Sequence, residues 1–112
     1  MSGRLASALL ASALVRRVND AGGFAVVRAK GDAQAGAFLI VALDRDNLHR
    51  VFERGLGPNG APMMIESTPA DSSADSVESY WRRRRERDPD LWVIELDIPA
   101  AERFAAETIG AR

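Results

Sequence analysis

Hydrophobic positions along the chain change their spacing several times, and each change predicts a new element. The first stretch, Leu5–Ala21, consists of good helix formers and ends at Gly22-Gly23, a typical helix stop. At 100° per residue, its main apolar stripe consists of Leu10, Leu14, Val18 and Ala21. Leu5 and Leu9 fall on the opposite, polar side, so we predict that they contact another part of the chain or a second copy in a homodimer.

Two β-rich runs, Phe24–Lys30 and Ala37–Asp44, flank a polar segment that begins at Gly31 and ends at Gly36. This arrangement predicts a hairpin, because glycine readily adopts the backbone conformations of tight turns. The second run is apolar from its first residue to its last but one, so both of its faces are expected to be buried. The hairpin is therefore predicted to form the centre of a small sheet.

Three further strands are predicted from the spacing of apolar and polar residues, at Leu48–Leu56, Met63–Glu66 and Leu91–Ile98. The first of these alternates regularly and is expected closer to an edge of the sheet. The face of that strand that carries Arg50 and Arg54 is interpreted as an ordinary solvated face.

Two more helices complete the order of elements. Residues 67–76 are rich in serine and are interpreted as a mobile polar link, which also supplies the N-cap of a second helix. That helix runs to about Arg87, where Asp88-Pro89 stops it, because the residue before a proline avoids the helical region. Pro99 opens a short helix in the C-terminal tail, residues 99–112.

The predicted order is α-β-β-β-β-α-β-α within one domain, residues 1–112. A meander of strands followed by a helical crossover predicts an α+β fold, in which helices pack on a mostly antiparallel sheet of about five strands. The length is typical of a single domain.

Composition narrows the classes of function. The chain has no cysteine, which excludes disulfides, thiolate metal ligands and a cysteine nucleophile. The net charge is −1, which argues against a nucleic-acid or anionic-membrane binder. No apolar run is long enough to span a bilayer. We therefore expect a cytoplasmic protein without a membrane partner.

The run Arg82–Arg87 is the most conspicuous charged feature, but on a helix it does not form one basic face. Arg84 instead falls in the apolar stripe that Tyr80 and Trp81 define. An arginine held against a core needs an acidic partner. The carboxylates expected to provide one are Asp88, Asp90, Glu95 and Asp97.

Two interpretations of Arg84 stay open. In the first, Arg84 ties the second helix to the strand that follows it. In the second, Arg84 belongs to a binding site for a small anion or a protein partner, and the other candidates for that site are Arg83, Arg87, Asp88 and Asp90.

Other chemistry has weaker support. Gly31 and Gly36 have the spacing of a phosphate loop, but the Lys-Ser/Thr pair that should follow is missing. The Arg82–Arg87 helix offers an alternative, a nucleic-acid accessory protein. A further alternative is a hydrolase centred on His49, the single histidine, but sequence cannot place a serine and an acid around it. No catalytic residue, metal or cofactor is assigned.

Several short motifs occur in an order that is similar to that of a known family: Leu14-Val15-Arg16-Arg17 with Gly22-Gly23, Lys30-Gly31-Asp32 with Ala35-Gly36, and Asp88-Pro89-Asp90-Leu91-Trp92-Val93 with Glu95. Over roughly residues 4–97 the chain resembles a bacterial family of small proteins known only as domain of unknown function 1491. It departs from that pattern in the link at 67–76 and in the extended tail, Pro99–Arg112. The resemblance implies a small soluble domain without an assigned activity, and it supplies no catalytic residue.

Taken together, these patterns predict a non-enzymatic binding or protein-interaction module. Its expected ligand is a protein partner or a small anion, with Arg84 at the site. Leu5 and Leu9 are the expected interface residues of a homodimer.

Overall fold

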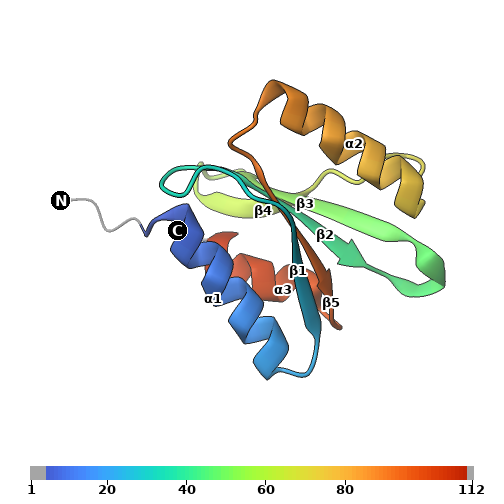
Figure 1. Cartoon of the computed structure of the whole chain (residues 1–112), viewed down its shortest axis with the longest axis horizontal. Coiled ribbons are helices and arrows are strands. Elements are labelled where there is room, and N and C mark those ends of the chain that lie inside the picture. The colour runs from blue at the N-terminus through green and yellow to red at the C-terminus, as the bar shows by residue number, and fades with distance from the viewer. Residues whose placement is uncertain (1–4, 111–112) are drawn as a thin grey trace.

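A five-stranded sheet with helices on both faces forms the body of the protein (Figure 1). The structure is a computed structural model that describes residues 5–110, except for the side chain of Arg45. The strands are β1 (Phe24–Ala29), β2 (Phe38–Leu43), β3 (His49–Leu56), β4 (Pro62–Glu66) and β5 (Trp92–Asp97). The helices are α1 (Ser7–Asp20), α2 (Ala74–Arg87) and α3 (Ala101–Ala105), with a 3₁₀ turn η1 (Arg45–Asn47) and a π turn η2 (Ala106–Gly110).

The strand order is β1-β5-β2-β3-β4, and every neighbouring pair is antiparallel except β5 and β2, which run parallel. This confirms the predicted α+β class and the mostly antiparallel sheet. It also confirms β2 as a central strand, since Phe38 through Ala42 are all buried. The strand β3 lies one position from the edge that β4 forms.

The predicted hairpin between β1 and β2 is wrong, because β5 lies between these two strands. The connecting loop instead arches over the start of β5. The backbone N–H of Asp32 donates to the carbonyl of Asp90 (3.0 Å), and a β-carbon at Gly31 or Gly36 would collide with that same carbonyl oxygen. These two glycines therefore allow close approach to the β5 segment and do not form a hairpin turn.

Each face of the sheet has its own core. On one face, α1, α3 and η2 cover β5 and β2, and the predicted stripe residues Leu10, Leu14 and Val18 are buried there. On the other face, Val77 and Trp81 of α2 pack over the central strands. The α2 crossover brings β5 back to the middle of the sheet, which is why its residues are buried on both faces.

The start of the link before α2 lies alongside β3 and is hydrogen-bonded to it. Ser67 donates its backbone N–H to the carbonyl of Val51 (2.8 Å), and the hydroxyl of Thr68 accepts from the N–H of Val51 (2.9 Å). Ser73 caps α2 by accepting from the N–H of Ser76 (3.3 Å). Within residues 5–110, no helix is long and apolar enough to cross a bilayer.

The predicted tail helix forms, but later than Pro99. It begins at Ala101, after Ala100 in the left-handed region (φ 58°), and continues into η2. The last two residues of the predicted tail, 111–112, lie outside the described residues. The tail is joined to α1 by Arg17, which donates to the hydroxyl of Thr108 (2.7 Å).

Candidate functional site

Arg84 is paired, but with none of the carboxylates that the sequence suggested. Its guanidinium donates to the carboxylate of Glu53 on β3 and to the hydroxyl of Tyr80 (3.0 Å). The predicted partners Asp88, Asp90, Glu95 and Asp97 are wrong, because Arg84 lies over β3, where the carboxylate of Glu53 accepts from it. Arg84 therefore ties α2 to β3.

Glu53 is the centre of a small polar network. Its side chain is 18% exposed, and it accepts hydrogen bonds from Ser67 (2.6 Å), Tyr80 (2.9 Å) and Arg84. Burial alone would raise the pKa of Glu53, but the hydrogen bonds from Ser67, Arg84 and Tyr80 outweigh it and lower the pKa. Glu53 is thus held as a carboxylate whose charge is already matched by Arg84.

The Asp88–Asp90 turn has a structural role. The carboxylate of Asp88 accepts from the N–H of Asp90 (3.1 Å), which is a local turn contact. Arg85, and not Arg84, holds this segment, because it donates to the carbonyls of Pro89 (2.8 Å) and Leu91 (3.1 Å). It also reaches the carbonyl of Lys30 at the end of β1 (3.0 Å).

The other predicted site residues are not brought together. Arg83 and Arg87 are exposed, and neither makes a hydrogen bond or an ion pair within the part of the chain that the structure describes. His49 lies at the start of β3, while Glu53, its closest acid along that strand, is engaged by Arg84. Among residues 5–110, no group of three or more acidic or histidine side chains could hold a metal ion.

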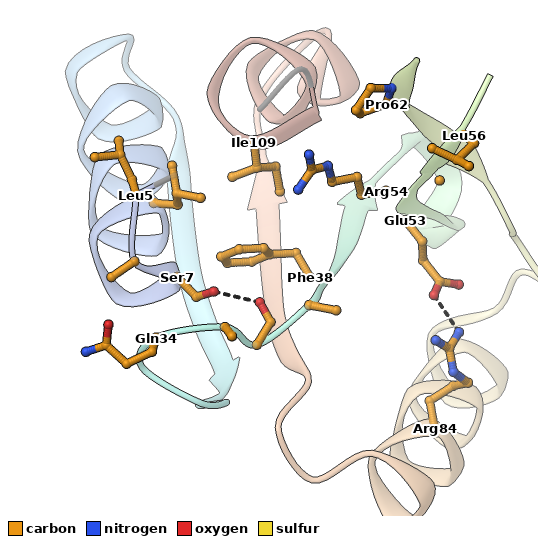
Figure 2. A pocket seen from close by; sticks show the side chains of 16 residues that line it. Leu5, Ser7, Gln34, Phe38, Glu53, Arg54, Leu56, Pro62, Arg84 and Ile109 are labelled. Carbon is orange, nitrogen blue, oxygen red and sulfur yellow. Dashed lines mark hydrogen bonds and ion pairs between the residues drawn. The ribbon is translucent and has the colours of Figure 1, made fainter. Parts of the chain in front are cut away.

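A cavity of about 750 Å³ lies between the N-terminus of α1 and the end of β3 (Figure 2). Its apolar lining residues are Leu5, Leu10, Phe38, Leu56 and Ile109. Its polar lining includes Gln34 at the α1 end, Arg54 beside Ile109, and the pair of Glu53 and Arg84 (Figure 2). Of the five predicted binding residues, Arg84 is the one that lines this cavity.

The cavity exists because the sheet has a notch there. The last pair between β2 and β3 is Leu39 with Glu53, whereas β3 continues to Leu56 alongside β4. The chain before β2 turns away toward α1 and β5. Its Gly36 carbonyl accepts from the buried hydroxyl of Ser7 (2.7 Å), and its Ala37 carbonyl accepts from the N–H of Trp92 (2.8 Å).

Arg54 is a candidate site residue that the sequence did not indicate. The sequence predicts a solvated face at this position of the strand. Arg54 is instead partly buried, and its guanidinium extends into the cavity (Figure 2). Arg50 on the same face pairs with Glu66 (2.9 Å). Arg54 makes no hydrogen bond or ion pair with any described residue. The one signal in the sequence was its position two residues after Phe52, on the same face of the strand.

The electrostatics of the cavity follow from these pairings. Arg54 and Arg84 contribute two positive charges, and Glu53 contributes one negative charge that is matched by Arg84. Arg54 therefore leaves one uncompensated positive charge in a partly apolar cavity. Such a site favours an anion, and the planar guanidinium suits carboxylate or phosphate oxygens.

Leu9 lies on the outer side of α1, as the helical periodicity predicts, and is 60% exposed. Leu5 precedes α1, which begins at Ser7; it is 49% exposed and lines the cavity. A second cavity of about 760 Å³ lies between α1 and β1. Arg28 on its wall is already paired with Glu78 (3.0 Å) and Glu95 (2.9 Å).

A family model described as "Protein of unknown function (DUF1491)" matches residues 5–106. The match confirms the resemblance, and it extends into the tail, so most of the segment after Pro99 is not a departure from the family. No significant match was found among curated proteins.

Solved structures agree with this match. The crystal structure of a DUF1491 family protein from Caulobacter crescentus CB15 is 31% identical, with a TM-score of 0.79 over 90% of this chain and 94% of that one. An NMR structure of a DUF1491 family protein from the same organism is 32% identical, with a TM-score of 0.74 over 89% and 91%. The solution structure of protein Atu0922 from A. tumefaciens is 30% identical, with a TM-score of 0.70 over 85% and 86%.

Proposed function

This chain belongs to the DUF1491 family of proteins of unknown function, and we propose that it is a non-enzymatic module that binds an anion in the notch of its sheet. The ligand group is a carboxylate or a phosphate, and Arg54 is the residue that binds it. Arg84, paired with Glu53, forms part of the wall.

One observation carries the proposal, the unpaired guanidinium of Arg54. A charge that is partly withdrawn from water without an acidic partner loses hydration free energy and gains nothing in return. The chain contains 16 acidic residues, yet none of those in the described part pairs with Arg54. A bound carboxylate or phosphate would supply the missing partner through paired, charge-assisted hydrogen bonds.

The lining of the cavity supports binding without catalysis. General acid–base chemistry needs a side chain that is free to exchange a proton with the ligand. The carboxylate in the cavity, Glu53, is held by three donors, and the hydroxyl of Ser7 is committed to the Gly36 carbonyl. The residues around Arg54 can therefore orient an anion, and they offer no acid or base to transform it.

The proposal is tested by thermal shift with acetate, succinate, glutarate and inorganic phosphate. A true ligand at saturating concentration should raise Tm by several degrees, because it binds the folded state alone. We expect Arg54→Gln to abolish the shift. Arg83→Gln, which removes an equal charge from the exposed surface of α2, should leave it unchanged.

Two results would contradict the anion site. One is that none of these compounds stabilises the native protein. The other is that a compound stabilises Arg54→Gln as strongly as the native protein, which would place its binding elsewhere.

A further inference from the structure

We propose that the ligand of this cavity is the C-terminus of an extended peptide from a partner protein, which adds to β3 as a short strand. This inference rests on the anion site at Arg54 and names the molecule that supplies the anion. The chain end would lie in line with β2, antiparallel to β3, with its terminal carboxylate on Arg54.

The first step of the argument is an open strand edge inside the notch. Residues Arg54, Gly55 and Leu56 pair with Met64, Met63 and Pro62 of β4 on one side. On the other side, β2 has already ended, so the described chain provides no strand partner there. Backbone groups on such an edge are a template for a further strand.

The second step is the direction of the added strand. The strand β2 begins at Phe38 and runs antiparallel to β3, with Leu39 opposite Glu53. A peptide that continues this line backwards would lie opposite Gly55 and Leu56, would bond to the backbone of Leu56 and would end where β2 begins. Its last carboxylate would therefore meet Arg54. The chain's own residues before β2 leave this line free, because the pairing of β2 with β3 ends at Leu39, and Ala37, Gly55 and Leu56 line the cavity.

The third step concerns the side chains of the peptide. Successive residues of a strand point to opposite faces, as Glu53 and Arg54 do here. One peptide side chain would enter the apolar wall of Leu5, Leu10 and Ile109. The next would face the pair of Glu53 and Arg84 on the α2 side. We therefore expect a chain end with an apolar residue in its last two positions.

The fourth step is size. The cavity of about 750 Å³ lies within the usual range of ligand sites, about 300–1,000 Å³. A folded domain could not enter it, whereas the end of a chain could. Inorganic phosphate could bind Arg54 but would leave the backbone groups of Leu56, which face the notch, unused.

The test compares two forms of one peptide library. Acetylated pentapeptides ending in leucine, isoleucine, valine, phenylalanine or methionine are prepared as free acids and as amides, and binding is followed by NMR titration. We expect the acids to bind at least tenfold more tightly than the amides, since the charged contact with Arg54 is lost on amidation. Arg54→Gln should reduce the affinity of the free-acid peptides to that of the amides. Arg83→Gln should leave the affinity of the free-acid peptides unchanged.

Hydrogen exchange gives an independent readout of strand addition. Saturating acid peptide should slow exchange of the backbone N–H of Leu56, which faces the notch, whereas acetate should not. If acids and amides bind equally, or no acid binds more tightly than acetate, the peptide inference is wrong; the anion site then stands only if small anions bind the native protein and not Arg54→Gln. If phosphate binds and no carboxylate does, the peptide inference is again wrong. If neither peptides nor small anions bind, both proposals fail.

Discussion

Three arginines on or next to β3 differ in what their side chains contact. Arg50 pairs with Glu66 and lies over the ring of Phe52 (4.8 Å to the centroid). Arg84 of α2 pairs with Glu53 of β3. Arg54 has no acidic partner among residues 5–110 and faces a cavity. The first two are engaged within the fold, and the third is the one for which we propose a ligand.

Removing the charge of Glu53 tests the network that forms one wall of the cavity. Glu53→Gln keeps the size of the side chain but leaves the guanidinium of Arg84 without its carboxylate. We expect the free energy of unfolding to fall by about 1–3 kcal/mol, as for a partly buried polar group that loses its partner. Urea denaturation measures this. Glu86→Gln is the control, because Glu86 is exposed on α2, and an equal loss in both variants would contradict the prediction.

The lowered pKa of Glu66 predicts that the folded protein becomes less stable in acid. Hydrogen bonds from Arg50 and Thr68 lower the pKa of Glu66 to about 2. A carboxylate with a lowered folded-state pKa stabilises the fold above its unfolded pKa, and that stabilisation is lost as pH falls through the folded pKa. Tm should therefore decrease between about pH 5 and pH 2. Glu66→Gln should flatten part of this decrease, and an unchanged slope would contradict the assignment.

At the scale of elements, the loop from Gly31 to Gly36 decides where the strands go. It packs on the carbonyl of Asp90 and accepts the indole N–H of Trp92 at the Asp32 carbonyl (2.8 Å). These contacts hold the chain over β5 and away from β3. The notch beside β3 is thus a consequence of the same contacts that place β5 at the centre of the sheet.

Gly36→Ala tests this loop. Its added β-carbon would collide with the Asp90 carbonyl and approach the Trp92 ring, so we expect a loss of about 1–3 kcal/mol from overpacking. Gly60→Ala is a matched contrast, because Gly60 has open space around it but a positive φ of 80°. Its cost should come from backbone strain alone, about 1–2 kcal/mol. Chemical denaturation compares the two, and a neutral Gly36→Ala would contradict the close packing.

At the scale of the whole molecule, the outer side of α1 is unusually apolar. Leu9 of α1 is 60% exposed, and Leu5, two residues before the helix, is 49% exposed. The homodimer through these two residues stays a prediction. Burial of such leucines against a second copy would be favourable, by about 1.5–3 kcal/mol for a fully buried side chain.

Sedimentation equilibrium tests the dimer. We expect the native protein to approach twice its monomer mass at high concentration, and Leu9→Arg to stay a monomer, because a charge in the contact would be desolvated. Leu48→Arg is the control, since Leu48 is similarly exposed (46%) and lies away from α1, next to β3. A monomer mass for the native protein at every concentration would contradict the prediction.

The elements themselves could be predicted, but their partners could not. The periodicity of α1 and the apolar run of β2 depend on neighbouring residues, and both were confirmed. The pairing of β2 with β5 joins segments about fifty residues apart, and local spacing contains no information on it. For the same reason, Arg84 was correctly expected to be paired while its partner Glu53 was missed.

The sequence by itself determined the class of fold, the order of the elements, the buried central strand and the family of the protein, because these depend on local patterns of apolar and polar residues. The tertiary structure alone decided the strand order, the notch beside β3 and the role of each arginine. Whether a charged side chain is paired depends on what the fold brings within a few ångströms of it. Arg54 is left unpaired by that arrangement, and it is the basis of the function proposed for this protein.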